Sequence, residues 1–140
     1  MRPLVPVLLF AVLAAGSAAA QGQADHRQTL TAMARVLGES HALRQTCAGP
    51  EDQFWRERML RLLEVEQPGQ ALERELKDAF NAGYADRQRV FEICDARTRD
   101  AEAATAARGR ALAAALKGGP GGAPVQDAPS DSMADDARSR

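Results

Sequence analysis

Side chains that build metal and catalytic centres are scarce in this chain. Its 140 residues contain two histidines, His26 and His41, and two cysteines, Cys47 and Cys94. A zinc site takes three or four closely spaced nitrogen, sulfur or oxygen ligands, and the sequence shows no such set. No serine, cysteine or carboxylate stands at a recognisable spacing from a histidine to complete a catalytic set. We therefore predict no metal site, no cofactor and no assignable catalytic residue.

Patterns typical of β-structure are also missing. β-branched residues are few, and no stretch alternates between apolar and polar residues with the period of two that a half-buried strand needs. Ala, Leu, Arg, Glu and Gln dominate, and all are good helix formers. The 18 basic side chains nearly balance the 19 acidic ones. Such a balance gives no electrostatic footprint for nucleic acid, so we expect an all-α protein without a nucleic-acid partner.

The N-terminus has the pattern of a secretory signal peptide in residues 1–20. Arg2 is followed by an apolar stretch over residues 4–15 and by the small residues Gly-Ser-Ala-Ala-Ala. A membrane anchor is the alternative, but a spanning helix needs about 20 predominantly apolar residues and this stretch is shorter. We predict cleavage between Ala20 and Gln21, export to the periplasm and no stable membrane anchor afterwards.

The C-terminal residues 118–140 lack Leu, Ile, Phe, Trp and Tyr and are rich in Gly, Pro, Ala, Ser and Asp. Such a segment cannot bury enough apolar surface to offset its ordering entropy. We predict a disordered tail, with a flexible docking tail as the alternative, and one folded domain over residues 21–117.

Apolar residues recur every three or four positions in the folded part, which predicts helices. The first runs from about Asp25 to Cys47 and is ended by Gly49-Pro50. The second opens at Glu51 or Asp52 and stops at Pro68-Gly69. A third begins near Gln70, with Phe91 and Cys94 on its buried side. Asp95 is expected to cap a fourth helix that ends near Lys117, although a single long helix over residues 70–117 remains an alternative.

Short connections favour antiparallel neighbours, so the fold expected is a small up-down bundle of three to four helices. The C-terminal ends of the first and third helices then meet, which brings Cys47 close to Cys94. A disulfide needs Cα atoms within about 7 Å, and two cysteines in an exported chain usually pair. We predict one structural disulfide, against the alternative of two unpaired buried thiols.

The same alignment predicts a polar cluster between the first and third helices. If Cys47 faces Cys94, Leu43 lies beside Val90, and His41 lies near Gln88. His41, Asn81, Tyr84 and Gln88 then line one seam, while Trp55 and Arg56 open the second helix. These residues are candidates for a binding site, in which His41 could act as a base and Tyr84 as a hydrogen-bond donor. A structural histidine at a helix seam is the alternative.

Gly83 interrupts this seam, and glycine costs about 1 kcal/mol relative to alanine inside a helix. Close approach of another helix or a kink would explain it. The functional alternative is a groove into which Asn81 and Tyr84 present polar groups. Gly109 in the fourth helix allows the same two interpretations.

Several short segments, taken in order, carry a family resemblance. They are Leu37-Gly38-Glu39-Ser40-His41-Ala42-Leu43-Arg44, Cys47-Ala48-Gly49, Trp55-Arg56-Glu57-Arg58-Met59, Glu66-Gln67-Pro68, Phe80-Asn81-Ala82-Gly83-Tyr84 and Cys94. This order resembles an uncharacterised family of small exported alphaproteobacterial proteins, classed as a domain of unknown function. The resemblance covers roughly residues 30–116. It implies a helical periplasmic protein with both cysteines as family features, and it supplies no activity, substrate or partner.

Three functional hypotheses follow. The first is a non-enzymatic periplasmic protein that binds another cell-envelope protein, with a regulator or adaptor of cell-wall remodelling as its most concrete form. The second is a small-ligand binder or an enzyme of a new type, which requires His41, Arg56, Asn81 and Tyr84 to converge in one concave pocket. The third is a purely structural or chaperone-like helical protein.

Overall fold

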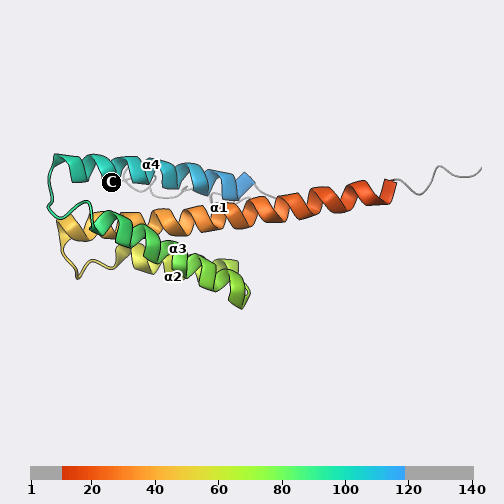
Figure 1. The fold of residues 1–140 in the computed structure, drawn as a ribbon, viewed down its shortest axis with the longest axis horizontal. Helices are drawn as coiled ribbons and strands as arrows, with labels where there is room; N and C mark the ends of the chain where they lie inside the picture. Colours follow the sequence, from red (N-terminus) through yellow and green to blue (C-terminus); the bar gives the residue numbers. More distant parts are fainter. Residues whose placement is uncertain (1–10, 119–140) are drawn as a thin grey trace, which may run out of the picture.

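A computed structural model describes residues 11–118, with side chains from residue 18 onward. Within that range there are four helices and no strands: α1 (Ala11–Ala48), α2 (Phe54–Glu66), α3 (Gln70–Gln88) and α4 (Ala96–Gly118). The predicted all-α class is confirmed. Figure 1 shows α1 as the longest helix, with α4 along one side and α2 and α3 along the other. All the extensive helix–helix packing involves α1, so the bundle is organised around it.

α1 begins well before the expected position near Asp25. Alanine is the best helix former, and neither glycine at positions 16 and 22 stops the helix. Cleavage after Ala20 would leave the helix starting near Gln21, and that cleavage stays a prediction. Residues 1–10 of the expected signal peptide and residues 119–140 of the expected tail lie outside the described residues. None of the four helices has an apolar stretch of the length that a membrane crossing requires.

The helix ends follow the expected capping residues with one shift. Gly49 takes a positive φ of 96° after α1, as a glycine past a helix end commonly does. α2 starts at Phe54 rather than at Glu51 or Asp52. Asp52 lies before the helix, and its carboxylate accepts a hydrogen bond from the Phe54 N–H at 3.2 Å. Asp95 caps α4 as predicted, accepting the Thr98 N–H at 2.9 Å.

α3 and α4 are separate helices, which excludes the long helix over residues 70–117. A continuous helix would carry α4 away from α1, where its Leu112 and Leu116 now pack against the core. The connector of residues 89–95 therefore contains Phe91 and Cys94, and placing them on the third helix was wrong. Phe91 is still buried, at 8% exposure.

The Cys47–Cys94 disulfide joins the end of α1 to this connector, with Cα atoms 4.8 Å apart. α1 and α3 run in the same direction, as the up-down topology requires (Figure 1). The residue-by-residue alignment predicted for α1 and α3 is off by about one turn. The chain from Tyr84 to Cys94 includes part of the connector and is longer than the chain from His41 to Cys47. His41 packs on Tyr84 rather than beside Gln88, and Val90 is half exposed instead of covering Leu43.

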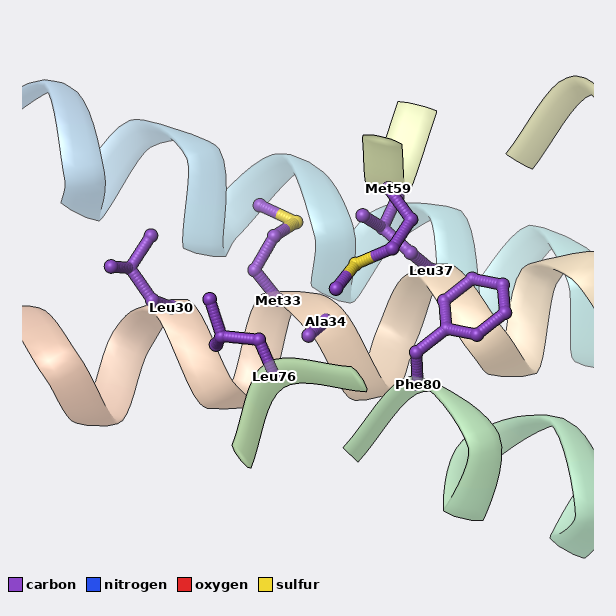
Figure 2. Packing of buried hydrophobic residues seen from close by; sticks show 7 residues of the cluster. All are labelled: Leu30, Met33, Ala34, Leu37, Met59, Leu76 and Phe80. Atoms are coloured by element: carbon purple, nitrogen blue, oxygen red, sulfur yellow. The ribbon is translucent and has the colours of Figure 1, made fainter. Parts of the chain in front are cut away.

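Residues of all four helices meet in one apolar core. The buried cluster takes most of its side chains from one face of α1, where they recur every three or four residues. Figure 2 shows the side chains of α1, α2 and α3 directed toward one another. The cluster consists of Leu30, Met33, Ala34, Leu37, Met59, Leu76 and Phe80.

Two glycines bring the backbones of α1 and α3 together. A Cβ atom placed on Gly38 would lie 1.9 Å from the carbonyl oxygen of Phe80, and one on Gly83 would lie 2.2 Å from that of Arg35. The close-approach explanation of Gly83 is therefore confirmed. Because both contacts are with backbone atoms, no side-chain rotation relieves them.

One buried carboxylate ties three helices together. Glu39 on α1 is 4% exposed and accepts hydrogen bonds from Arg87 of α3, at 3.0 and 2.8 Å, and from Arg108 of α4. Burial by itself would raise the pKa of Glu39, but the hydrogen bonds from Arg108 and Arg87 outweigh it and hold the pKa below its ordinary value. The carboxylate therefore stays charged and fixes how α3 and α4 sit on α1.

Glu39→Gln is expected to lower the free energy of unfolding by about 2 kcal/mol. Breaking a fully buried ion pair costs about 3–5 kcal/mol, and the partial exposure of both arginines reduces that loss. Glu64→Gln, which removes the exposed partner of Arg61, is the control and is expected to change stability by less than about 0.5 kcal/mol. Urea unfolding measures both, and equal effects of the two substitutions would contradict the assignment.

Candidate functional site

An open groove of about 490 Å³ lies between α2 and α3, with α1 contributing to its wall. Its volume is within the range of ligand-binding pockets, about 300–1,000 Å³. α2 and α3 pack mainly on α1 rather than on each other, which leaves the space between them. The lining residues are His41 and Gln45 of α1, Gln53, Arg56, Met59, Leu60 and Leu63 from the α2 region, and Lys77, Phe80, Asn81 and Tyr84 of α3.

The four residues of the proposed ligand-binding cluster, His41, Arg56, Asn81 and Tyr84, all line this groove. They come from three helices, and two features of the fold bring them together. α2 and α3 run antiparallel on one side of α1 (Figure 1), so the start of α2 faces the end of α3. The close crossing at Gly38 and Gly83 then holds the α3 residues against α1. The convergence that this hypothesis requires is present.

His41 is the most deeply placed of them. It is 5% exposed, and its ring lies 5.8 Å from that of Phe80 and 5.4 Å from that of Tyr84, measured between centroids. Its Nδ1 atom is sealed from solvent and has no hydrogen-bond partner in the structure. Burial, followed by the positive charge of Arg56, lowers the pKa of His41, while Asp52 partly opposes the change. His41 is therefore a neutral imidazole at neutral pH.

Tyr84 is held by the fold. Its hydroxyl donates to Gln45 Oε1 at 2.8 Å and accepts from Gln88 Nε2 at 3.2 Å. Gln45 Nε2 in turn donates to the carbonyl oxygen of Pro50 at 2.8 Å. This chain of hydrogen bonds links α3 to the loop after α1, so both hydrogen-bonding functions of the Tyr84 hydroxyl are used within the protein.

Arg56 and Asn81 differ from Tyr84 in having no hydrogen bond or ion pair from their side chains to any residue of the described part. Lys77, at the other end of the groove, pairs with Glu73 at 2.5 Å. No carboxylate belongs to the lining, and nearby Asp52 is held by Arg44 at 2.8 Å. Within the described residues the groove therefore keeps the positive charge of Arg56 without a partner, and polar side chains from three helices line it.

Trp55 lies outside the lining of this groove, apart from the other candidates. Its half-buried ring packs against the core cluster, and its indole Nε1 is buried without a partner. The ring also contacts Phe54 edge-on, with centroids 5.0 Å apart. Trp55 thus helps to anchor the start of α2, which positions Arg56. Within residues 11–118, no group of three His, Cys, Asp or Glu side chains is arranged to hold a metal ion.

The apolar wall of the groove and its second cation were not among the site residues predicted from the sequence. On α2, Met59, Leu60 and Leu63 follow Arg56 at spacings of three, four and seven residues, and on α3 Lys77 precedes Asn81 by four. These are the spacings of one helix face. This spacing is visible in the sequence, but only the structure shows that the two helix faces line the same groove.

The neutral state of His41 predicts a pH effect on stability. The folded protein binds a proton at His41 less readily than the unfolded chain, whose histidine pKa is about 6.5. Above that pH the residue makes no difference, and stability falls as pH drops below it, by at most about 1.4 kcal/mol per pH unit. His41→Gln should remove this part of the pH dependence in urea unfolding between pH 7.5 and 5. Parallel pH curves for both proteins would contradict a lowered pKa.

Comparison with known proteins identifies the family. Residues 25–118 match the family described as "Protein of unknown function (DUF2385)", and the chain belongs to it. The match begins in the first part of α1 and includes every residue that lines the groove. Neither a curated protein nor a solved structure matches the chain.

Proposed function

We propose that this family member is a non-enzymatic protein of the periplasm that binds another cell-envelope protein through the groove between α2 and α3. The observation that carries the proposal is the set of unpartnered polar groups of His41, Arg56 and Asn81, which face one groove from three helices. Arg56 and Asn81 are exposed, so a bound partner can reach their guanidinium and amide groups directly.

The chemistry of the lining supports binding rather than catalysis. The groove offers no carboxylate or thiol, and its one hydroxyl, on Tyr84, is already engaged on both sides. His41 has no adjacent nucleophile to activate and no carboxylate to orient it. The groove is open and has an apolar wall of Met59, Leu60 and Leu63, which suits a segment of a protein better than a small polar metabolite.

Periplasmic location is part of this proposal. The signal-peptide pattern of residues 1–20 and a disulfide at the surface both support it, because disulfides persist in oxidising compartments. We expect mass spectrometry of the protein isolated from its native cells to show an N-terminus at Gln21. A chain that retains Met1 to Ala20 would contradict export by cleavage. A regulator or adaptor of cell-wall remodelling is the most concrete form of the proposed role.

An affinity pull-down from periplasm with matched variants tests the binding role. Arg56→Glu reverses a groove charge in the first turn of α2, where an acidic residue is favourable to the helix. Arg99→Glu makes the same change in the first turn of α4, at an exposed position outside the groove lining. We expect one envelope protein to be retained by the wild-type and Arg99→Glu proteins and lost by Arg56→Glu. Equal retention by all three would contradict the groove as the binding surface.

A second candidate function is binding of a small ligand, with an enzyme of a new type as its extension. The convergence of His41, Arg56, Asn81 and Tyr84 in one groove favours it, and the neutral imidazole of His41 can accept a proton. If the pull-down finds no partner while all three proteins are folded, screening with metabolites tests this candidate.

A further inference from the structure

The occupant of the groove can be narrowed to one chemical class, an inference that rests on the proposed function. We propose that the groove binds a short extended peptide segment of the partner protein that carries an acidic residue at the Arg56 end and an apolar residue beside it. Charge, groove length and the arrangement of polar and apolar side chains each support this assignment.

The charge of the groove selects an acidic partner. Its lining contains no carboxylate, His41 is neutral and Lys77 is paired with Glu73, so the positive charge left without a partner among the described residues is that of Arg56. Arg56 is exposed and forms no ion pair within the described residues, so its guanidinium is available to a carboxylate from outside. A basic partner would face Arg56 without any compensating carboxylate in the lining.

The two cations mark opposite ends of the groove. Because α2 and α3 run antiparallel (Figure 1), Arg56 near the start of α2 lies toward the Tyr84 end of α3, and Leu63 lies toward Lys77. Lys77 and Tyr84 are seven residues apart, which corresponds to about 10 Å along a helix. An extended chain rises about 3.3 Å per residue, so the groove holds about three residues of a peptide.

Apolar side chains and side-chain amides both line the groove. Met59, Leu60 and Leu63 face Phe80 across it, and Leu60 is 58% exposed, which leaves an open apolar surface for a partner side chain. Asn81 has an unpartnered amide with both donor and acceptor groups, which matches the N–H and C=O of a peptide backbone. An acidic side chain next to an apolar one fits this order of groups along the groove.

A random heptapeptide library displayed on phage tests the assignment without assuming a sequence. The target is the full chain as purified after export, and the selected consensus peptide is then synthesised and titrated by fluorescence anisotropy. We expect peptides enriched in Asp or Glu next to a large apolar residue. Their affinity should fall at least tenfold with Arg56→Glu and stay unchanged with Arg99→Glu, and replacing the acidic residue of the peptide by Lys should restore binding to Arg56→Glu.

The assignment of an acidic peptide would be overturned if the library yields neutral or basic peptides, or no binding peptide. Equal binding of acidic peptides to the wild-type and Arg56→Glu proteins would also overturn it. Circular dichroism is used to check that each variant is folded. If neutral peptides are selected and Asn81→Leu abolishes their binding, the inference fails while the groove remains a recognition site. If the periplasmic partner is also retained by Arg56→Glu, the proposed function fails as well.

The acidic residues at the C-terminus of the chain are a competing occupant. Asp127, Asp131, Asp135 and Asp136 lie in residues 119–140, which contain no large apolar residue other than Met133 and Val125. A consensus that matches this segment, together with tighter peptide binding by a chain ending at Gly118, would assign the groove to the protein itself. That result would overturn an external partner.

Discussion

Replacing Cys47 and Cys94 together by serine is expected to lower the free energy of unfolding by about 4 kcal/mol. The disulfide closes a loop with a sequence separation of 47 residues, and the chain-entropy model gives about 4 kcal/mol for a loop of that length. A domain of this size is stable by about 5–15 kcal/mol in total. The disulfide therefore supplies a large part of the stability of the domain.

The loss should begin at the connector of residues 89–95. Besides the disulfide, a hydrogen bond from the Thr46 hydroxyl to the carbonyl oxygen of Phe91 at 3.0 Å holds this segment to α1. Phe91 should become exposed first. Urea unfolding of the double variant measures the total effect, and hydrogen exchange at residues 89–95 measures the local one.

Reduction of the wild-type protein is the matched control for this substitution. The reduced wild type and the double serine variant should have the same unfolding midpoint, because both lack the cross-link. A change of less than about 1 kcal/mol in both proteins would show that the connector is held by packing alone.

Gly38→Ala is expected to destabilise the protein by about 2 kcal/mol, although alanine is the better helix former. The added methyl would lie 1.9 Å from the Phe80 carbonyl oxygen, so α1 and α3 must move apart. Overpacking of this kind costs about 1–3 kcal/mol and occasionally more. The gain in helix propensity, about 1 kcal/mol, is too small to reverse the sign.

Two further variants define the effect. Gly83→Ala should also destabilise, and the double variant should cost less than the sum, because one displacement of α3 relieves both contacts. Gly109→Ala is the control, since its methyl would lie 3.3 Å from the Val36 Cγ1 atom and stability should change by less than about 1 kcal/mol. Thermal unfolding ranks the variants, and a stabilising Gly38→Ala would contradict the close crossing.

Local signals in the sequence were sufficient for the helical class and for several helix ends, although they placed Phe91 and Cys94 wrongly on the third helix. Gly49, Pro68 and Asp95 act at helix ends, and these effects depend only on neighbouring backbone groups. The direction of each helix followed from short connections. The pairing of Cys47 with Cys94 then followed from the parallel course of α1 and α3.

The packing between residues far apart in the sequence could not be predicted from such local signals. The alignment of α1 with α3 depends on the length and path of the connector and on the contacts of Gly38 and Gly83, which no local pattern specifies. Glu39 gave no signal that it would be buried, because the two arginines that donate hydrogen bonds to it are 48 and 69 residues away in sequence. The candidate residues of the groove were found from their polar character at helix faces, but Tyr84 proved to be held by the fold.

Site-specific photocrosslinking in cells tests the central claim most directly. A benzophenone amino acid is placed at Asn81 in the groove and, in a separate variant, at Arg99 outside it. We expect one envelope protein to be crosslinked from position 81 and not from position 99, and Arg56→Glu in the same chain should abolish the adduct. A partner crosslinked equally from both positions, or only from position 99, would show that the groove between α2 and α3 is not the recognition surface.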